Sequence, residues 1–561
     1  MVTNKYITRI ASVIMAAAVI LCLMASLFSD KLQEVYGNNA VTMKYESKLF
    51  STDQIMDIDI LMDEDDWNNM LENAISEEYY SCNVVVNGKT FYSVGIRPKG
   101  NTSLSSIAND PDTDRYSFKL EFDHYIEGQT CYGLDKLILN NNYADATNMK
   151  EAIVYDMYQY LGVDASLYNY AKISVNGDYR GVYLALEAVE DSFMLRNYGT
   201  EDGNLYKPES MGIGGGVDGN GFPQKGEMPD GEDFPQKDEM PDGEDFPQMG
   251  EAPNGEAADI KMGIMGGNGG SDLNYTDDDL DSYSTIWDGE ITDTDKKDHK
   301  RVVEALKNIS EGTDLETYMD VDNILKYMAV HTFVVNDDSL SGIMAHNYYL
   351  YEYNGKLNIL PWDYNLSFGG MSMGGKMGGQ SLGATSVIND AIDTPFSITD
   401  FFDALLENEE YLEQYHGYLN ELVEKYVNGG EFEKTYERIR SQIDDLVGND
   451  PTAFYSYEEY EEAANMLIEV VQLRAKSVSG QLAGTIPSTD EGQQQDSSNL
   501  IDGSDIDLSV MGSFSGGGGG NEGQGKDNGF AGTPQPFDAG DVSPISEEKA
   551  DLQDSNQDSV K

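Results

Sequence analysis

Three short polar clusters between residues 336 and 365 carry residue types suited to metal and phosphate chemistry. Asn336-Asp-Asp-Ser339 closes a predicted helix, His346-Asn-Tyr348 opens a predicted β-hairpin, and Pro361-Trp-Asp-Tyr-Asn365 ends that hairpin. Because a hairpin brings its two ends together, we expect these clusters to converge. Carboxylate and amide oxygens suit Mg²⁺ or Mn²⁺ rather than zinc. Such a set can position a metal–nucleotide and leave one carboxylate to accept a hydroxyl proton.

A structural explanation competes with this chemical one. Asp and Asn are common at helix ends and in turns, where their side chains cap backbone N–H groups. Capping is the favoured explanation for Asp337 alone. It explains less for Asp363, which stands between Trp362 and Tyr364 at the end of a predicted strand.

Basic residues in the first half of the chain are candidates for contacting phosphate. Arg97 and Lys99 leave a predicted strand for a polar loop, and Lys119 lies between Phe118 and Leu120 in an apolar strand. Strand alternation also allows Lys119 to be an ordinary surface lysine that points outward. Lys207 is a further basic candidate, and Glu187 ends a strand where it could mark a hinge.

The order of predicted elements indicates an α+β protein. Residues 41–206 mix short strands with helices, and Asn-Gly pairs at 87–88 and 176–177 predict two β-hairpins. We therefore expect an antiparallel sheet in this half. Residues 273–482 are mostly of helical pattern, interrupted by a hairpin around Asn354-Gly355.

Composition divides the chain into five parts. Residues 209–273 contain three copies of a twelve-residue unit with Pro and Gly in each copy, which cannot bury a core. The tail is rich in Gly, Ser, Gln and Asp, so it is also expected to be disordered. The predicted parts are a signal or anchor at 1–30, a first domain at 41–208, the insert at 209–273, a helical domain at 274–483, and the tail at 484–561.

The charge of the chain restricts its partners. It contains 36 Lys and Arg against 100 Asp and Glu, a formal net charge of −64. This excludes an ordinary nucleic-acid binder, because nothing would neutralise the phosphates, and it favours cationic partners. Three cysteines exclude a disulfide scaffold and a multi-cysteine zinc site.

The N-terminus has the pattern of a membrane signal. Residues 10–28 form an uncharged apolar run preceded by Lys5 and Arg9. This length is close to that of a membrane-spanning helix, and the charge asymmetry places the bulk of the chain outside. An uncleaved anchor is the favoured interpretation, with a cleaved signal as the alternative. Both predict a location on the outer face of a bacterial membrane, or secretion to a spore or cell surface.

Taken together, these stretches resemble the spore coat protein CotH kinase family, over about residues 44–482 apart from the insert. The family's usual Arg-x-Arg-Gly-Asn has Lys99 in place of the second Arg, which keeps the charge but loses bidentate geometry. The matching stretches are Gly95-Ile-Arg97-Pro-Lys99-Gly-Asn101-Thr-Ser103, Tyr116 to Phe122, Asn148-Met-Lys150-Glu151-Ala-Ile, Val175 to Glu187, Gly203-Asn-Leu-Tyr-Lys207, Val335-Asn-Asp-Asp338-Ser, His346 to Tyr351, and Pro361-Trp-Asp-Tyr-Asn-Leu-Ser-Phe-Gly369.

The resemblance implies a fold and an activity. The fold is an atypical protein-kinase-like fold of two lobes, with an antiparallel-sheet N-lobe that forms the nucleotide half and a mostly helical C-lobe that carries the catalytic hairpin. The activity is transfer of phosphate from ATP to Ser of a protein, with Mg²⁺ or Mn²⁺ as the metal.

The resemblance also assigns roles by position. Asp338 matches the catalytic aspartate, and Asp363 matches the metal-binding aspartate, with Asn347 as its neighbour. The residues that match nucleotide-binding positions are Arg97, Lys99, Lys119, Glu151, Glu187 and Lys207.

Two classes of function remain open from the sequence. The first is an active kinase whose substrate is a basic, Ser-containing protein, since the acidic chain attracts cations. The second is a non-catalytic cell-surface adhesin or scaffold that uses the same fold. Metal-dependent nucleotide binding distinguishes the two.

Overall fold

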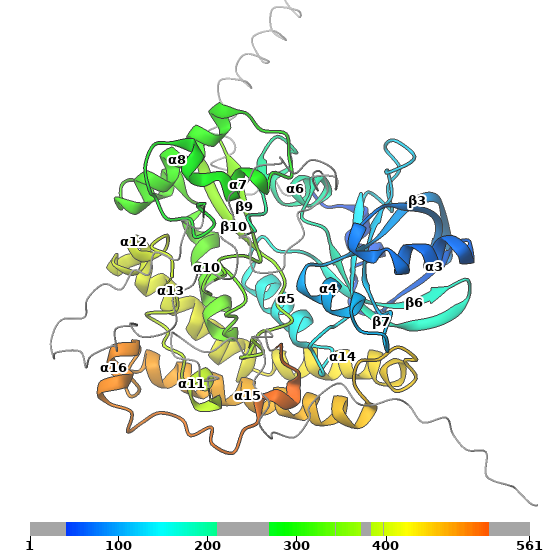
Figure 1. Cartoon of the computed structure of the whole chain (residues 1–561). Coiled ribbons are helices and arrows are strands. Elements are labelled where there is room, and N and C mark those ends of the chain that lie inside the picture. The colour runs from blue at the N-terminus through cyan, green and yellow to red at the C-terminus, as the bar shows by residue number, and fades with distance from the viewer. Residues whose placement is uncertain (1–40, 210–268, 343, 372–382, 397, 515–561) are drawn as a thin grey trace, which may run out of the picture. The chain divides into compact units, whose positions relative to one another are not determined.

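The computed structural model describes residues 41–209, 269–342, 344–371, 383–396 and 398–514, which all belong to one compact unit (Figure 1). The apolar run at 10–28 and the twelve-residue repeats lie outside these ranges. Within the described ranges, no helix is both long and apolar enough to span a bilayer.

The first half of the described chain forms a closed barrel of seven strands, in the order β1-β2-β3-β4-β5-β7-β6. Neighbouring strands are antiparallel except β1 and β6, which run parallel from Met56 opposite Ala171 to Ile60 opposite Val175. The strands are β1 (Met56–Leu61), β2 (Tyr80–Val86), β3 (Lys89–Lys99), β4 (Ser117–Glu121), β5 (Lys136–Asn140), β6 (Tyr168–Val175) and β7 (Asp178–Glu187).

Alternation of apolar and polar residues explains why these segments become barrel strands. Ile58 and Ile60 of β1 are fully buried in one apolar cluster with Val84 of β2, while the residues between them are more exposed. The predicted hairpin turns are confirmed: Asn87 links β2 to β3 and Asn176 links β6 to β7, both with positive φ.

The predicted two-lobed kinase-like fold with an antiparallel-sheet N-lobe is wrong. The protein is α+β, but its sheet is mixed and closes on itself through the parallel β1–β6 pair. Hairpin signals report only pairs of strands that are adjacent in the sequence. The closing pair joins strands more than 100 residues apart, and no local pattern specifies it.

A second, smaller sheet has the order β10-β9-β8 and lies among the helices. Its strands are β8 (Asn204–Tyr206), β9 (Tyr348–Tyr353) and β10 (Lys356–Pro361), and the predicted hairpin at Asn354-Gly355 joins β9 to β10. Since β8 precedes the insert and β9 follows it, this sheet connects the two halves of the chain.

Helices fill the rest of the described chain. Those before the insert are α2 (Lys44–Lys48), α3 (Glu64–Glu72), η1 (Ala74–Ser76), α4 (Thr102–Ala108), α5 (Lys150–Leu161) and α6 (Asp191–Tyr198). Those after it are η2 (Leu280–Tyr283), α7 (Ser284–Asp288), α8 (Lys296–Ser310), α9 (Leu315–Tyr318), α10 (Val321–Val334), α11 (Ala384–Ile388), α12 (Asp403–Leu406), α13 (Glu409–Glu421), η3 (Leu422–Val427), α14 (Glu431–Gly448), α15 (Tyr457–Leu482), α16 (Asp490–Gln495) and η4 (Leu508–Met511).

Helix α5 is the centre of this packing. Most of its residues are buried, and it contacts α10, α14 and β6. It ends at Gly162, whose φ of 74° is the left-handed conformation typical of a helix C-terminus.

The ordered chain continues into the part assigned by composition to the tail. Residues 484–514 include α16 and η4, and Met511 is buried. The N–H of Ala146 donates to the carbonyl of Met511, and that of Phe514 donates to the carbonyl of Gly370. This segment therefore lies against the loop before α5 and the loop after β10.

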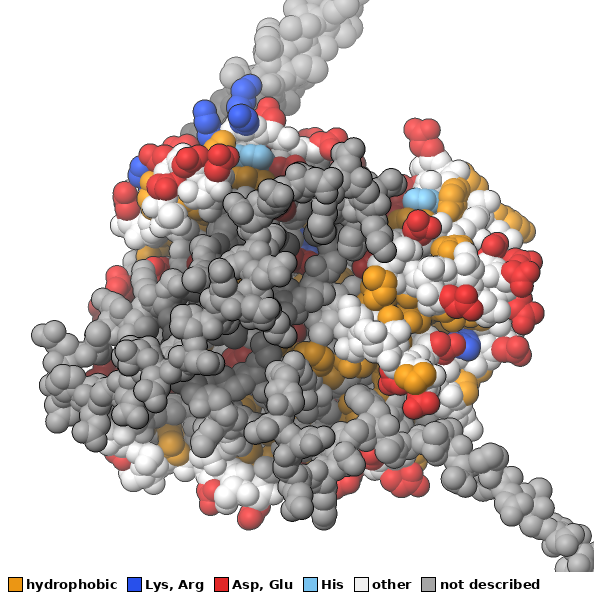
Figure 2. Space-filling model, in the orientation of Figure 1, with side chains coloured by type: hydrophobic (Ala, Val, Ile, Leu, Met, Phe, Trp, Pro, Cys, Tyr) orange, Lys and Arg blue, Asp and Glu red, His pale blue; other side chains and the backbone are white. Residues whose placement is uncertain are grey.

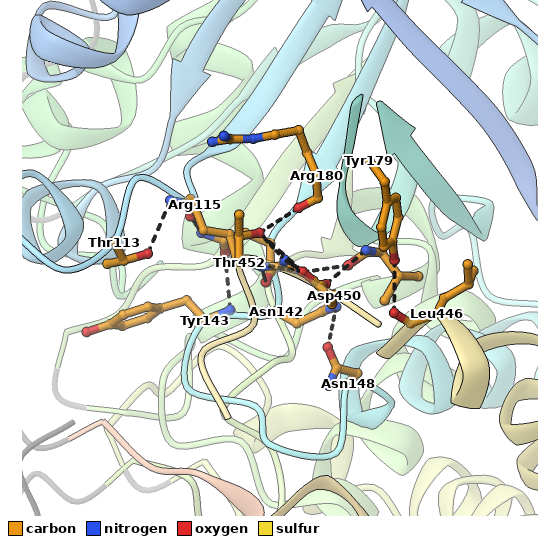
Figure 3. Close-up of polar contacts among 12 residues, drawn as sticks. Thr113, Arg115, Asn142, Tyr143, Asn148, Tyr179, Arg180, Leu446, Asp450 and Thr452 are labelled. Atoms are coloured by element: carbon orange, nitrogen blue, oxygen red, sulfur yellow. Dashed lines mark hydrogen bonds and ion pairs between the residues drawn. The ribbon is translucent and has the colours of Figure 1, made fainter. Parts of the chain in front are cut away.

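A buried ion pair joins the barrel to the helices that follow it (Figure 3). Arg115, just before β4, pairs with Asp450 at 2.8 Å, and both side chains are only 2% exposed. The same guanidinium donates to Thr452 and to the carbonyls of Asn141 and Val182. All three nitrogens of the guanidinium thus donate hydrogen bonds within the protein.

We expect Asp450→Ala to lower the free energy of unfolding by about 3–5 kcal/mol, because it leaves Arg115 charged, buried and without its carboxylate. Lys434→Ala, which breaks an exposed pair with Glu431, is the control and should leave stability within error. Urea unfolding of both variants makes the comparison. Equal losses would show that the Arg115 pair has no special role.

Candidate active site

The loop after α10 holds Asp338 in a fixed orientation. Its Oδ1 accepts a hydrogen bond from Nε2 of His346 at 2.7 Å. Its Oδ2 and its backbone carbonyl both accept from the side-chain amide of Asn347, at 3.0 and 2.8 Å. The carboxylate is 13% exposed, so it is positioned by protein groups while still reaching the surface.

Asp363 lies two residues after the end of β10, in a left-handed conformation with φ of 59°. Burial raises the pKa of this carboxyl. The nearby positive charge of Lys99 works against that rise, the negative charge of Asp338 adds to it, and Lys207 and His346 again oppose it. The carboxyl group of Asp363 therefore lies close enough to Asp338, Lys99, Lys207 and His346 to feel their charges. The sequence predicted that Asp338 and Asp363 would converge.

Lys99 reaches the same point from the end of β3. Its Nζ donates to Oδ1 of Asn140 on β5, and the amide of Asn140 donates to Glu151 at the start of α5. The Lys99 amine also lies over the Trp362 ring, 5.4 Å from its centroid. Burial lowers the pKa of Lys99, and the charges of Asp363 and Glu151 partly offset this.

Glu151 is 3% exposed. Burial and the charge of Asp363 raise the pKa of this carboxyl to about 8, although the hydrogen bond from Asn140 opposes the shift. The backbone N–H of Tyr364 also opposes the shift, although no group meets strict hydrogen-bond geometry at Oε1. Glu151 is therefore a buried carboxyl with a raised pKa that lies beside Asp363 and Asn140.

The other basic residues proposed from the sequence each have an acidic partner in the structure. Arg97 and Lys119 are opposite one another on β3 and β4, on the same side of the barrel wall as Lys99. Arg97 pairs with Glu77, while Lys119 pairs with Glu190 at 2.6 Å. Lys207 pairs with Glu209 at 2.5 Å, and its charge acts on both Lys99 and Asp363.

The structure does not bring Glu187 to this point. Its carboxylate is fully buried and accepts hydrogen bonds from Arg196 on α6 and from the hydroxyl of Tyr45 on α2. It also accepts from the backbone N–H of Leu167. These contacts fix two helices to the barrel, which is a structural role.

Two contributors were not predicted from the sequence, and a third was named there without a role. Asn140 and Glu209 stand in no recognisable pattern, and only their positions on β5 and after Lys207 give them a role. His346 carried a signal, since it adjoins Asn347 in the polar cluster. Burial lowers the pKa of His346, but its hydrogen bond to Asp338 and the charges of Asp338 and Glu209 outweigh this and raise it.

The donor set fits a hard cation only in part. Among the described residues no three His, Cys, Asp or Glu side chains cluster closely enough to hold a metal by themselves. Oxygen ligands are nevertheless present, because Asn336 donates to the carbonyl of Asp363 while its own buried Oδ1 has no partner. With Asp363 beside it, this set suits Mg²⁺ that keeps waters and substrate oxygens as its other ligands.

A cavity of about 360 Å³ lies elsewhere, between η1 and α4. Ala74, Ile107 and Tyr116 are among its lining residues, and the lining includes none of the candidate site residues. The site is therefore not this cavity.

Comparison with known families decides the assignment. A family model described as CotH kinase protein matches residues 96–478, which is most of the chain. The chain belongs to the CotH kinase family. A search of curated proteins finds no match. The family match spans Arg97, Lys99, Glu151, Asp338 and Asp363, so every part of the candidate site lies inside it.

The raised pKa of Glu151 predicts a pH-dependent stability. The folded protein holds this proton up to about pH 8, whereas an unfolded chain releases it near 4.5, so stability should fall as pH rises between these values. We expect Glu151→Gln to remove that decline, making the variant melt higher than the native protein at pH 9 but not at pH 4.

Thermal melts in the presence of a chelator test this, with Glu462→Gln on the exposed face of α15 as the control. A stability difference between Glu151→Gln and the native protein that is the same at both pH values would contradict the raised pKa.

Proposed function

We propose that this CotH kinase family protein transfers phosphate from ATP to Ser residues of a protein. The observation that supports it most is the meeting of Lys99 and Lys207 with Asp363 and Asp338. In a chain of net charge −64, the two lysines bring positive charge that can contact an anion to the same point as two carboxylates that can hold a metal.

Each group then has a distinct task. Lys99 and Lys207 bind phosphate oxygens as point charges, and Arg97 and Lys119 extend the basic side of the barrel wall. Asp363, with Asn336 and Asn347 beside Asp338, provides oxygens that would hold the metal. When bound, Mg²⁺ or Mn²⁺ neutralises charge on the phosphate oxygens.

Asp338 orients the substrate hydroxyl and accepts its proton. The hydrogen bonds from His346 and Asn347 fix the carboxylate, so it does not need to reorganise during transfer. The remaining lone pairs of the carboxylate are available to the serine hydroxyl. The raised pKa of His346 keeps a proton beside Asp338, which balances part of its charge.

The location of the protein is a further part of the proposal. The charge asymmetry around the apolar run 10–28 supports an anchor that holds the kinase on the outer face of a bacterial membrane. Its substrate would then be a surface or spore-coat protein.

Substitutions of Asp363 and of Asp338 should affect ATP binding and phosphate transfer differently. Asp363→Ala should weaken metal-dependent ATP binding and abolish transfer, because it removes the metal ligand. Asp338→Asn should keep the Kd for nucleotide within a few-fold while kcat falls about 10²-fold or more, the usual scale for a lost general base. Nucleotide titration with and without Mn²⁺ or Mg²⁺, alongside transfer of labelled phosphate, measures both.

Asp337→Asn is the matched control, since it removes a neighbouring carboxylate that the mechanism does not use. If the native protein binds no nucleotide with either metal, the kinase proposal fails and a scaffold role replaces it. If Asp338→Asn loses nucleotide as completely as Asp363→Ala, the division of roles is wrong.

The acidic surface should select basic substrates. Figure 2 shows many Asp and Glu side chains on the described part of the visible face and few Lys or Arg. We expect a Ser peptide flanked by Lys or Arg to be phosphorylated with a higher kcat/KM than an acidic one, and added salt to reduce the difference. Equal rates for both peptides at low salt would disprove the preference.

A further inference from the structure

A buried histidine, His331 on α10, connects the loops that carry the two aspartates. It is 2% exposed, and its Nδ1 lies 3.0 Å from the hydroxyl of Tyr364, the residue after Asp363. Its Nε2 lies 2.8 Å from Oγ of Ser341 and 3.3 Å from Oγ of Ser339, on the loop of Asp338. One side chain thus touches both loops.

The hydrogen bonds around His331 are all satisfied by one tautomer of the neutral ring. The hydroxyls of Ser339 and Ser341 can both donate to the carbonyl of Asn336, at 2.9 and 3.0 Å, and then accept from the ring. In this arrangement Nε2 carries the proton and donates. Nδ1 is then the acceptor for the Tyr364 hydroxyl.

A neutral imidazole fits this arrangement, because a charged ring has no nitrogen that can accept from the Tyr364 hydroxyl. Burial lowers the pKa of His331 to about 3, which agrees with that requirement. The chain continues beyond Tyr364, whose hydroxyl lies 2.5 Å from that of Tyr158 on α5. It therefore runs from the helix that bears Glu151 to the loop that bears Asp338.

We propose that His331 is a positioning residue that sets the distance between Asp338 and Asp363. The imidazole of His331 is hydrogen-bonded to Tyr364, the residue after Asp363, and to Ser339 and Ser341 on the loop of Asp338. Rings of Tyr327 and Phe396 stack at 5.5 and 5.1 Å from its own, so the imidazole cannot swing away from these partners. The kinetic part of this inference rests on the proposed kinase function.

His331→Phe and His331→Gln test the proposal. Phenylalanine keeps the ring volume and stacking but removes both hydrogen bonds, whereas glutamine keeps one donor and one acceptor. In His331→Phe we expect amide hydrogen exchange to rise about tenfold at residues 336–342 and 361–371, and kcat to fall about tenfold with the nucleotide Kd within about threefold. His331→Gln should recover part of both.

Two further variants provide a control and a replacement for His331→Phe. His416→Phe, which removes a histidine bonded to Asp393, is the control and should leave exchange in both loops unchanged. Ser341→Ala removes one bond of the chain and should raise exchange at 336–342 alone. If His331→Phe does not fold, hydrogen exchange in Ser341→Ala tests the proposal in its place.

Unchanged exchange in both loops of folded His331→Phe would overturn the proposal. So would a rise spread evenly over the helices, since that result assigns His331 to general packing. If the native protein transfers no phosphate, the proposed function fails, but the exchange comparison still decides whether His331 positions the two loops.

Discussion

The buried pair between Arg115 and Asp450 is the constraint on which the placement of the site depends. An arginine and an aspartate, each almost fully removed from water, must satisfy one another and their neighbours, or the folded state becomes costly. The approach is so close that a side chain at Gly181, which has φ of 138°, would collide with both. Glycine is therefore required at this point of β7.

The pair also determines the path of the chain that leads into α5. The side-chain amide of Asn141 donates to the carbonyl of Arg115, and the Asn141 carbonyl accepts from its guanidinium. The following loop is closed by Asp145 and Thr147, whose oxygens accept from the backbone N–H of Lys150. Glu151 therefore enters the site at a fixed position, and the contacts of Met511 with Ala146 restrain the same loop.

The site itself is electrostatically unfavourable to the fold. Burial raises the pKa of Asp363, the charge of Asp338 adds to that rise, and Glu151 beside them has its own pKa raised to about 8. Lys99 and Lys207 supply only part of the compensation. A protein selected for stability alone would not keep this cluster, whereas carboxyl groups with strongly shifted pKa values beside lysines are typical of functional sites.

The sequence by itself determined the local parts of this protein. The Asn-Gly turns specified three hairpins, and the short distance along the chain between Asp338 and Asp363 was enough to predict their meeting, because one hairpin separates them. Only the tertiary structure decided the closed barrel, the bridge from Lys99 through Asn140 to Glu151, and the link through His331. Their partners lie far apart in the sequence, so the contacts depend on loop closure and on core packing, which no local pattern records.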